Sequence, residues 1–296
     1  GVLAAGGTLG ILIPPSVVLI VAAIVVEANI ETLFQAAFIP GLIAVGGYIL
    51  AISIVVRLFP DTGPAGLRAT AQEKLRALVS IWPVIAIFTL VIGGIYAGLF
   101  TPTEAASVGA VSMGIVAVTR GKMRLKGLTD AVMETAVSTA MIFLILFAAN
   151  LLNAFLGFTR LPIVLSEMIS GSGLSPMMVL LLIVAIFIVL GMFMDSLSMI
   201  LLFLPIFWPI MMVLDFGMGV EDLKVWFSII TLMVVEMGLI TPPVGLNVFV
   251  INSMAGDVSM RDSFRGVLPF LISDFFRIAI LILFPGLTLF LPHILK

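Results

Sequence analysis

The chain has 296 residues, of which 62% are hydrophobic and only 10% are charged, and its formal net charge is −2. A soluble domain carries about 25% charged residues, so this composition, with a mean hydropathy of +1.33, excludes a soluble globular protein and indicates an integral membrane protein. The charge gives no indication of nucleic-acid binding, and the absence of cysteine excludes disulfides and Cys-ligated metals.

Apolar runs of about 20 residues recur along the chain, and a helix of this length spans the hydrocarbon core of a bilayer. The alternating ten-residue segments of a membrane β-barrel are absent, so we predict an all-α fold. We expect membrane segments near residues 2–26, 34–58, 79–100, 103–119, 128–150, 175–192, 196–213, 224–254 and 266–292. Because the chain enters an apolar run directly at Gly1, we expect a fragment or processed chain whose earlier helices are missing.

The connections between these segments indicate the orientation of the chain. Three connections are basic: residues 57–77, which include Arg68, residues 120–126 (RGKMRLK) and residues 255–265. The positive-inside rule places such loops in the cytoplasm. The other connections are mainly acidic, with Glu27 and Glu31, the TPTE sequence at 101–104, and Asp215, Glu221 and Asp222. We expect these acidic connections to face outward.

With this orientation, segments 175–192 and 196–213 begin and end on the outer side. Only GMFMDSLS (residues 191–198) joins them. They form either two full spans or a re-entrant hairpin whose tip stops inside the membrane. Both arrangements leave the two ends on the outer side, so the orientation of the other segments does not distinguish them. The polar tip residues Asp195 and Ser196 favour the hairpin.

Two Pro-Pro pairs interrupt apolar runs, in GTLGILIPPS (7–16) and in GLITPPVGLN (238–247). Adjacent prolines remove two backbone donors and clash with the preceding turn, so neither helix continues undisturbed. The two sequences match as G-[IL]-[IL]-x-P-P. The match extends downstream, because Pro40 and Pro269 open apolar spans 25 and 26 residues after the pairs, and both spans reach Leu-Phe-Pro at 58–60 and 283–285. The chain therefore contains an internal repeat.

The loop charges place the end of the first broken segment outside and the end of the second inside, so the copies point in opposite directions. One such proline pair is more often a simple kink, but an inverted repeat places binding sites at the bilayer midplane between discontinuous helices. Unpaired backbone groups at this depth are tolerated only inside protein or along a polar cavity. Freed carbonyls coordinate a cation, and the N-terminus of the next half-helix attracts an anion. The breaks therefore predict a site for Na⁺ and a carboxylate.

In these motifs the chain resembles the large membrane subunit of the tripartite ATP-independent periplasmic (TRAP) transporters. The other matching stretches are YAGLFTPTEAASVGA (96–110), LGMFMDSLSMILLFLPIFWPI (190–210), GLITPPVGLNVFV (238–250) and FPGLTLFLP (284–292). The resemblance implies an elevator-type secondary transporter for organic anions, typically C4-dicarboxylates, sialic acid or other sugar acids, with Na⁺ as coupling ion and no cofactor. It also implies a bacterial or archaeal cytoplasmic membrane, a small four-helix membrane subunit and a periplasmic binding protein.

The resemblance further implies two pseudo-symmetric sodium sites, each formed by a hairpin tip and a neighbouring broken helix. Carried over to this chain, one site uses backbone oxygens around Gly10, Leu12 and Pro15. The other site uses Asp195, Ser196, Gly238, Ile240, Thr241 and Pro243. From their positions, we expect Thr8, Ser16 and Asn247 to contact substrate between the two sites.

Several alternatives stay open. A stand-alone sodium and anion carrier of related architecture needs no binding protein, and a passive channel or a purely structural subunit is also conceivable. The sequence contains no HExxH, GxSxG or P-loop motif, and its single histidine, His293, lies at the C-terminus. A membrane enzyme is therefore the least favoured function.

The remaining charged residues in or beside the apolar segments are expected to have mainly local partners. Asp274 and Arg277 lie at i and i+3, a spacing that lets them pair on one helix face; we expect this pairing, or contact with the scaffold subunit, rather than substrate binding. Glu236 either accepts local backbone amides or faces the ion-coordinating shell. Glu104 in TPTE resembles an N-terminal helix cap in which Thr101 or Thr103 starts the helix.

The predicted organisation has three parts. Residues 1–58 form a first-repeat transport region, residues 59–158 contain scaffold-like spans, and residues 159–296 form a second-repeat transport region. An interfacial helix is expected at 159–173. From the resemblance, we expect the linker there to let the hairpin move against a scaffold of residues 79–150.

Overall fold

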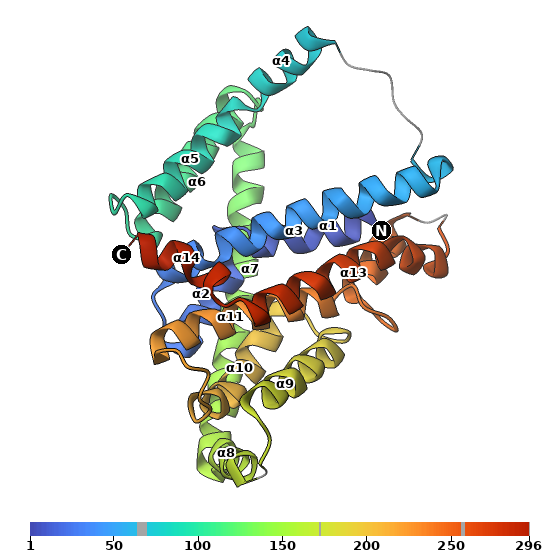
Figure 1. Cartoon of the computed structure of the whole chain (residues 1–296). Helices are drawn as coiled ribbons and strands as arrows, with labels where there is room; N and C mark the ends of the chain where they lie inside the picture. Colours follow the sequence, from blue (N-terminus) through green and yellow to red (C-terminus); the bar gives the residue numbers. More distant parts are fainter. Residues whose placement is uncertain (64–69, 172, 256–257, 296) are drawn as a thin grey trace. The chain divides into compact units, whose positions relative to one another are not determined.

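The computed structural model describes residues 1–63, 70–171, 173–255 and 258–295, and these residues form helices and no strand (Figure 1). The all-α prediction is confirmed. The helices are α1 (Val2–Leu12), α2 (Val17–Val26), α3 (Ile30–Leu58), the 3₁₀ turn η1 (Pro60–Thr62), α4 (Ala71–Ser80), α5 (Trp82–Tyr96), α6 (Pro102–Thr119), α7 (Leu125–Thr159), α8 (Leu161–Gly171), α9 (Pro176–Gly191), α10 (Ser196–Met212), α11 (Val220–Gly238), α12 (Leu246–Ala255), α13 (Met260–Leu283) and α14 (Gly286–Ile294). Arg68 of the basic 57–77 connection lies outside the described residues.

The chain forms two compact units. The first comprises Gly1–Pro60 and Leu146–Lys296, and the second comprises Asp61–Ile145. Both copies of the predicted repeat therefore belong to the first unit. The scaffold and transport roles assigned to parts of the sequence stay predictions.

Within the described residues, α3, α7 and α13 are each long and apolar enough to cross a membrane. Two further pairs meet the same criterion as bent spans: α1 with α2, bent by 48°, and α4 with α5, bent by 49°. The first of these bends lies at Pro14-Pro15, as predicted. Helix α8 lies within the segment predicted to be an interfacial helix.

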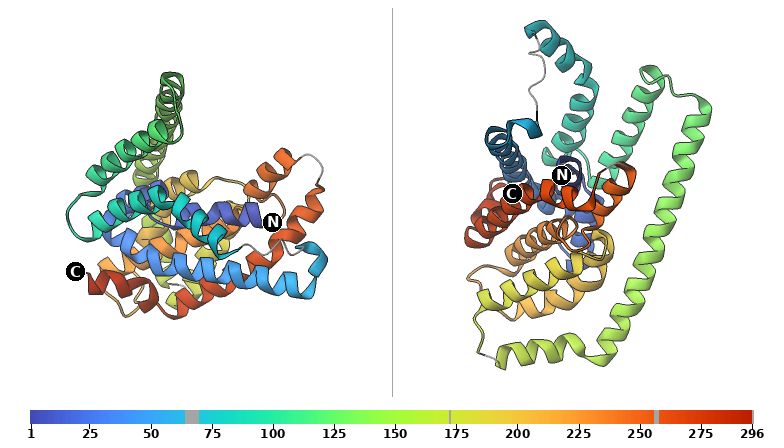
Figure 2. Two further views of the ribbon diagram at one scale, coloured as in Figure 1. Left: turned by 90° about the horizontal axis from the view of Figure 1, so that it is seen from above. Right: turned by 90° about the vertical axis from the view of Figure 1, so that its right-hand side faces the viewer.

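Helices α9 and α10 are short for full spans. They have 16 and 17 residues, or about 24 and 26 Å at about 1.5 Å per residue, whereas the hydrocarbon core of a bilayer is about 30 Å thick. Their lengths favour the re-entrant hairpin. Figure 2 shows both helices, in yellow and gold, lying beside α11 in orange.

Two predicted spans have different limits in the structure because of proline. The span predicted at 266–292 ends at Leu283, and α14 follows it. Pro285 has no N–H for the carbonyl of Leu281, which instead accepts a 2.9 Å hydrogen bond from Trp226 Nε1. The span predicted at 79–100 begins at Ala71 and bends near Ile81, two residues before Pro83.

Helix α11 forms the centre of the first unit. Its buried residues run from Leu223 to Gly238 and cover every face of the helix, which is the pattern of a helix surrounded by protein. It packs against α9, α10, α13 and α3. Glu236, near its C-terminal end, is thereby held in the interior of the unit.

The long helices of the two repeats, α3 and α13, lie side by side and antiparallel (Figure 1). Each contains its predicted proline, Pro40 or Pro269. Each ends in nearly the same conformation, with φ −132° and ψ 77° at Phe59 and φ −126° and ψ 72° at Phe284. Equivalent helices that end alike and run in opposite directions support the inverted repeat.

Two connections predicted to face outward meet at one end of this unit. Lys224 Nζ donates a 3.3 Å hydrogen bond to the carbonyl of Glu27, which ends α2 in the left-handed conformation. The same Lys224 forms a 2.9 Å ion pair with Glu221. These two connections therefore lie at the same end of the unit, which agrees with their predicted placement on one side of the membrane.

Candidate ion and substrate site

The tip of the α9–α10 hairpin lies directly against the end of α11. A Cβ atom added to Gly238 would lie 2.8 Å from Gly191 Cα and 3.1 Å from the carbonyl oxygen of Ile188. Backbone atoms cannot move aside as a flexible side chain does. Glycine at both positions therefore allows the hairpin tip and the broken helix to touch through their backbones.

A buried polar contact joins the same two elements. Ser196 Oγ, on the first residue of α10, donates a 2.5 Å hydrogen bond to Glu236 Oε1. Glu236 therefore accepts a bond from a side chain of the hairpin tip; that it faces an ion-coordinating shell stays a prediction. Ser196 is also buried.

Asp195 has a different environment from Ser196. It is exposed and caps α10, where its carboxylate accepts bonds from the backbone amide of Ser198 at 3.0 Å and from the Ser198 hydroxyl at 2.6 Å. N-terminal capping of this kind is a common role for aspartate. An exposed carboxylate beside buried Ser196 also gives the tip an acidic surface.

The second break rearranges the backbone bonds of α11. Pro242 and Pro243 have no N–H for the carbonyls of Gly238 and Leu239. The Gly238 carbonyl instead accepts from the Thr241 amide at 2.9 Å, and the Leu239 carbonyl accepts from the Asn247 amide at 3.0 Å. These carbonyls are therefore bonded, contrary to the simple expectation that the prolines leave them free.

The remaining predicted residues of the second break lie close to this rearranged backbone. Ile240 is fully buried, and the Thr241 hydroxyl donates a 2.7 Å bond to the Met237 carbonyl. Pro243 is exposed, and Asn247 is partly buried.

The first break has a similar form. Helix α1 ends at Leu12, which is buried, and α2 begins after Ser16, whose hydroxyl accepts from the Leu19 amide at 3.4 Å as an N-cap. Gly10 and Pro15 are exposed. A Cβ on Gly10 would meet no atom within 4 Å, unlike its repeat equivalent Gly238.

The two broken helices and the two long helices share one apolar cluster. Its buried members come from α1, from the second break, and from α3, α12 and α13: Ala4, Ala5, Tyr48, Ala51, Ile240, Val248, Val267, Phe270 and Leu271. The structure therefore brings the second break and α1, the helix that precedes the first break, into the same core.

A chain of buried polar groups crosses this core. Thr8 of α1 donates to the Ala5 carbonyl at 2.7 Å and lies 3.2 Å from the Tyr48 hydroxyl. Tyr48 donates to Asp274 Oδ2 at 2.8 Å. Arg277 Nη2 lies 2.9 Å from Asp274 Oδ1, which confirms the predicted pair. Thr8, predicted to contact substrate, is thus engaged with protein atoms.

Tyr48 was missed by the sequence reasoning, although the repeat contains a signal for it. Tyr48 lies eight residues after Pro40, and Arg277 lies eight residues after Pro269. The two polar side chains therefore occupy equivalent positions in the two repeats, and in the structure both contact Asp274. That Na⁺ and substrate bind the residues implied by the resemblance stays a prediction.

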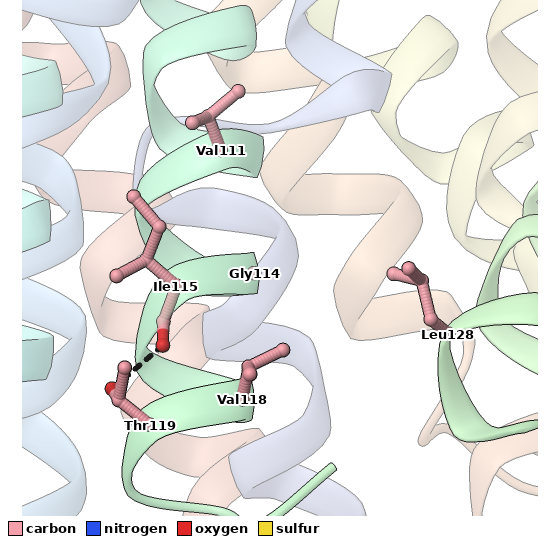
Figure 3. A pocket seen from close by; sticks show the side chains of 6 residues that line it. All are labelled: Val111, Gly114, Ile115, Val118, Thr119 and Leu128. Atoms are coloured by element: carbon pink, nitrogen blue, oxygen red, sulfur yellow. Dashed lines mark hydrogen bonds between the residues drawn. The ribbon is translucent and has the colours of Figure 1, made fainter. Parts of the chain in front are cut away.

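The second unit contains a pocket of about 370 Å³ between α6 and α7 (Figure 3). Its lining is Val111, Gly114, Ile115, Val118, Thr119 and Leu128. The Thr119 hydroxyl donates to the Ile115 carbonyl at 2.7 Å. This lining offers no charged group, whereas the junction of α10 and α11 offers the carboxylates of Asp195 and Glu236 to a cation.

The chain matches one known protein family over nearly its whole length. The family model described as "Tripartite ATP-independent periplasmic transporter, DctM component" matches residues 1–287. The C4-dicarboxylate TRAP transporter large permease protein DctM of Pseudomonas aeruginosa is 36% identical over 295 residues, which cover 99% of this chain and 67% of the relative.

Two further relatives carry other substrate names. The sialic acid TRAP transporter large permease protein SiaM of Vibrio cholerae is 30% identical, covering 99% of this chain and 67% of the relative. The 2,3-diketo-L-gulonate TRAP transporter large permease protein YiaN of Escherichia coli is 26% identical, covering 98% and 66%. The chain therefore spans about two thirds of the length of these relatives.

Proposed function

Because this chain belongs to the TRAP transporter family as a large membrane subunit, we propose that it couples Na⁺ entry to the uptake of an organic anion. The observation that carries this proposal is the contact between the hairpin tip and the broken helix α11. Ser196, Glu236 and the backbone around Gly238 meet there at a buried junction. Such junctions of discontinuous elements are where secondary transporters bind ions and substrate.

The proposed substrate is a C4-dicarboxylate, since the relative at 36% identity is named for that class. Sialic acid and other sugar acids are the alternatives that the other relatives' names suggest. We further propose that a periplasmic binding protein delivers the anion, that a small membrane subunit completes the transporter, and that the assembly lies in a bacterial cytoplasmic membrane.

The proposed driving force is the entry of sodium. Each Na⁺ that enters down a membrane potential releases about 2.3 kcal/mol per 100 mV, so two or more ions sustain strong accumulation of an anion. In this proposal Na⁺ binding orders the two breaks before the anion binds, and the hairpin-bearing region then carries the site across the membrane in an elevator movement.

Uptake into proteoliposomes tests this function. The chain is reconstituted with its small subunit, the binding protein is added outside, and radiolabelled succinate is the probe, with sialic acid in a parallel series. We expect uptake only with an inward Na⁺ gradient and with binding protein present. Uptake without binding protein would identify a stand-alone carrier, and equal uptake with choline in place of Na⁺ would reject sodium coupling.

Replacing the exposed carboxylate at the hairpin tip gives a sharper prediction. We expect Asp195→Ala to abolish or strongly reduce Na⁺-dependent uptake, because the tip loses its charge beside Ser196. Asp215→Ala is the matched control, since Asp215 is also an exposed aspartate whose carboxylate accepts a local amide bond, from Gly217 at 2.8 Å. Undiminished uptake by Asp195→Ala would reject the assigned role.

A further inference from the structure

Glu236 is a carboxylate held inside the first unit. Its exposed fraction is 0%. Oε1 accepts the bond from Ser196, whereas Oε2 has no hydrogen-bond partner among the described residues. An acceptor left unpaired in a protein interior has lost its hydrogen bonds to water without replacement, and this destabilises the protein more when the acceptor is charged. A ligand that satisfies Oε2 would remove this cost.

The surrounding charges favour a cation as that ligand. Among the residues that the structure describes, the other buried charged side chains are Asp274 and Arg277, which lie 2.9 Å apart and compensate each other. As a carboxylate, Glu236 therefore leaves one buried negative charge without a counter-ion. A single charge at this depth is costly and requires a partner.

The hydrogen bond also fixes the direction of the Ser196 hydroxyl. Since the Ser196 proton is donated to Glu236, the lone pairs of Oγ are available to a cation. Carboxylates that accept a bond from a metal ligand orient that ligand and increase its basicity. Ser196 directly follows the exposed Asp195, so a second carboxylate lies one residue from the buried hydroxyl.

We propose that Glu236 is the positioning residue of the second ion site: its carboxylate holds Ser196 Oγ as a ligand for a monovalent cation and supplies the compensating negative charge. The inference rests on the proposed function, because Na⁺ is the cation concerned. Glu236 lies outside both Pro-Pro motifs and outside the hairpin, so it is not among the ion ligands that the resemblance to TRAP subunits implies.

Direct Na⁺ binding tests the role of Glu236 independently of the substrate. The full chain is purified in detergent, and its thermal unfolding midpoint is measured against NaCl, with choline chloride holding the ionic strength constant. We expect Na⁺ to stabilise the wild type with a saturable midpoint. For Glu236→Gln, which keeps an acceptor for Ser196 but loses the charge, we expect that midpoint to rise about 10- to 100-fold.

A control variant and a transport measurement separate positioning from general stability. Glu134→Gln removes an exposed carboxylate on α7 and should leave the Na⁺ midpoint unchanged. In the succinate uptake assay at saturating Na⁺, Glu236→Gln should keep the wild-type KM for succinate while requiring more Na⁺. A purely structural role would lower stability without moving the Na⁺ requirement.

The outcomes distinguish the inference from the proposed function. A wild-type Na⁺ midpoint in folded Glu236→Gln overturns the role of Glu236 and leaves the transport function standing. Absence of any Na⁺ response in the wild type instead overturns sodium coupling itself. If Glu236→Gln does not fold, Ser196→Ala provides the second test, with the same expected rise, and a wild-type midpoint in that variant overturns the inference.

Discussion

Arg277 and Asp274 place opposite charges on one face of α13, with 2% and 1% of their side chains exposed. Their nearest atoms are 2.9 Å apart, but the guanidinium nitrogens make no hydrogen bond within the described part of the chain. The pair therefore depends on charge attraction rather than on ideal bonding. Tyr48 supplies the one hydrogen bond to Asp274 from another helix.

Removing one partner of this pair tests that account. We expect Arg277→Met to destabilise the protein by about 3–5 kcal/mol, because Asp274 is left as an uncompensated buried charge. The double variant Arg277→Met/Asp274→Leu should recover much of that loss. Chemical unfolding in detergent measures both, and simple additivity of the single losses would contradict the explanation.

Tyr48→Phe tests the bond between α3 and α13. The variant keeps the ring packed edge-on against Phe270, with centroids 5.0 Å apart, but leaves Asp274 Oδ2 without its donor. We expect a loss of about 1–3 kcal/mol and a lower unfolding temperature. Ser53→Ala on the same helix is the control, since its exposed hydroxyl bonds only the Ile49 carbonyl; an equal loss there would refute the special role of Tyr48.

At the scale of elements, the contact between the hairpin and α11 depends on two glycines. In Gly238→Ala the new Cβ would meet Gly191 Cα at 2.8 Å, and only backbone movement relieves this clash. We expect a loss of about 1–3 kcal/mol together with weaker Na⁺-dependent uptake, because the hairpin tip moves away from Glu236.

Gly157→Ala provides the comparison for that prediction. Gly157 lies in helix α7, where a Cβ would meet nothing within 4 Å. This variant should be neutral or slightly stabilising, since alanine favours helix over glycine. Equal effects of the two substitutions on uptake would show that close packing at the hairpin tip is unimportant.

At the scale of the whole molecule, the antiparallel contact between α3 and α13 joins two copies of one sequence pattern. A Cβ on Gly47 would lie 3.7 Å from Ser273 Cβ, within the usual Cβ separation of about 3.5–4.5 Å for a disulfide. Because the chain has no cysteine, Gly47→Cys/Ser273→Cys should form a single disulfide in membranes. Gel mobility with and without reductant measures it.

The neighbouring pair Gly46→Cys/Ser273→Cys is the control for that cross-link. Gly46 lies one residue away on α3, and a Cβ there would meet no atom within 4 Å. We expect little or no disulfide from this pair. Efficient cross-linking of the control but not of the Gly47 pair would place α3 in a different register against α13.

Much of the fold was predictable because the signals are local. Apolar length indicated the membrane helices, and proline predicted the breaks at Pro14-Pro15 and Pro242-Pro243. The end of the last span was predicted wrongly, at residue 292. In the structure this helix ends at Leu283, because Pro285 interrupts the backbone hydrogen bonds of its last turn. The TPTE motif predicted an N-terminal helix cap at Thr101 or Thr103, and the structure places it at Thr101, which forms a capping box with Glu104.

The candidate site was only partly predictable. The residue pattern indicated a polar hairpin tip and a broken helix as separate features, and the resemblance to TRAP subunits implied that they are partners. It left Glu236 undecided between local amides and the coordination shell, since its neighbours along α11 do not determine which face of the helix meets the hairpin. It also missed Tyr48, whose partners Thr8 and Asp274 are 40 and 226 residues away.

The sequence by itself determined that this protein is helical, lies in a membrane and contains two opposed, proline-broken copies of one pattern, because hydropathy, charge and proline act within a few residues. Only the tertiary structure decided that Ser196 bonds Glu236, that Gly191 meets Gly238, and that Arg277 is compensated by Asp274 beneath Tyr48. The pairing of buried polar groups depends on which helix faces are brought together, and that packing is set by the whole chain.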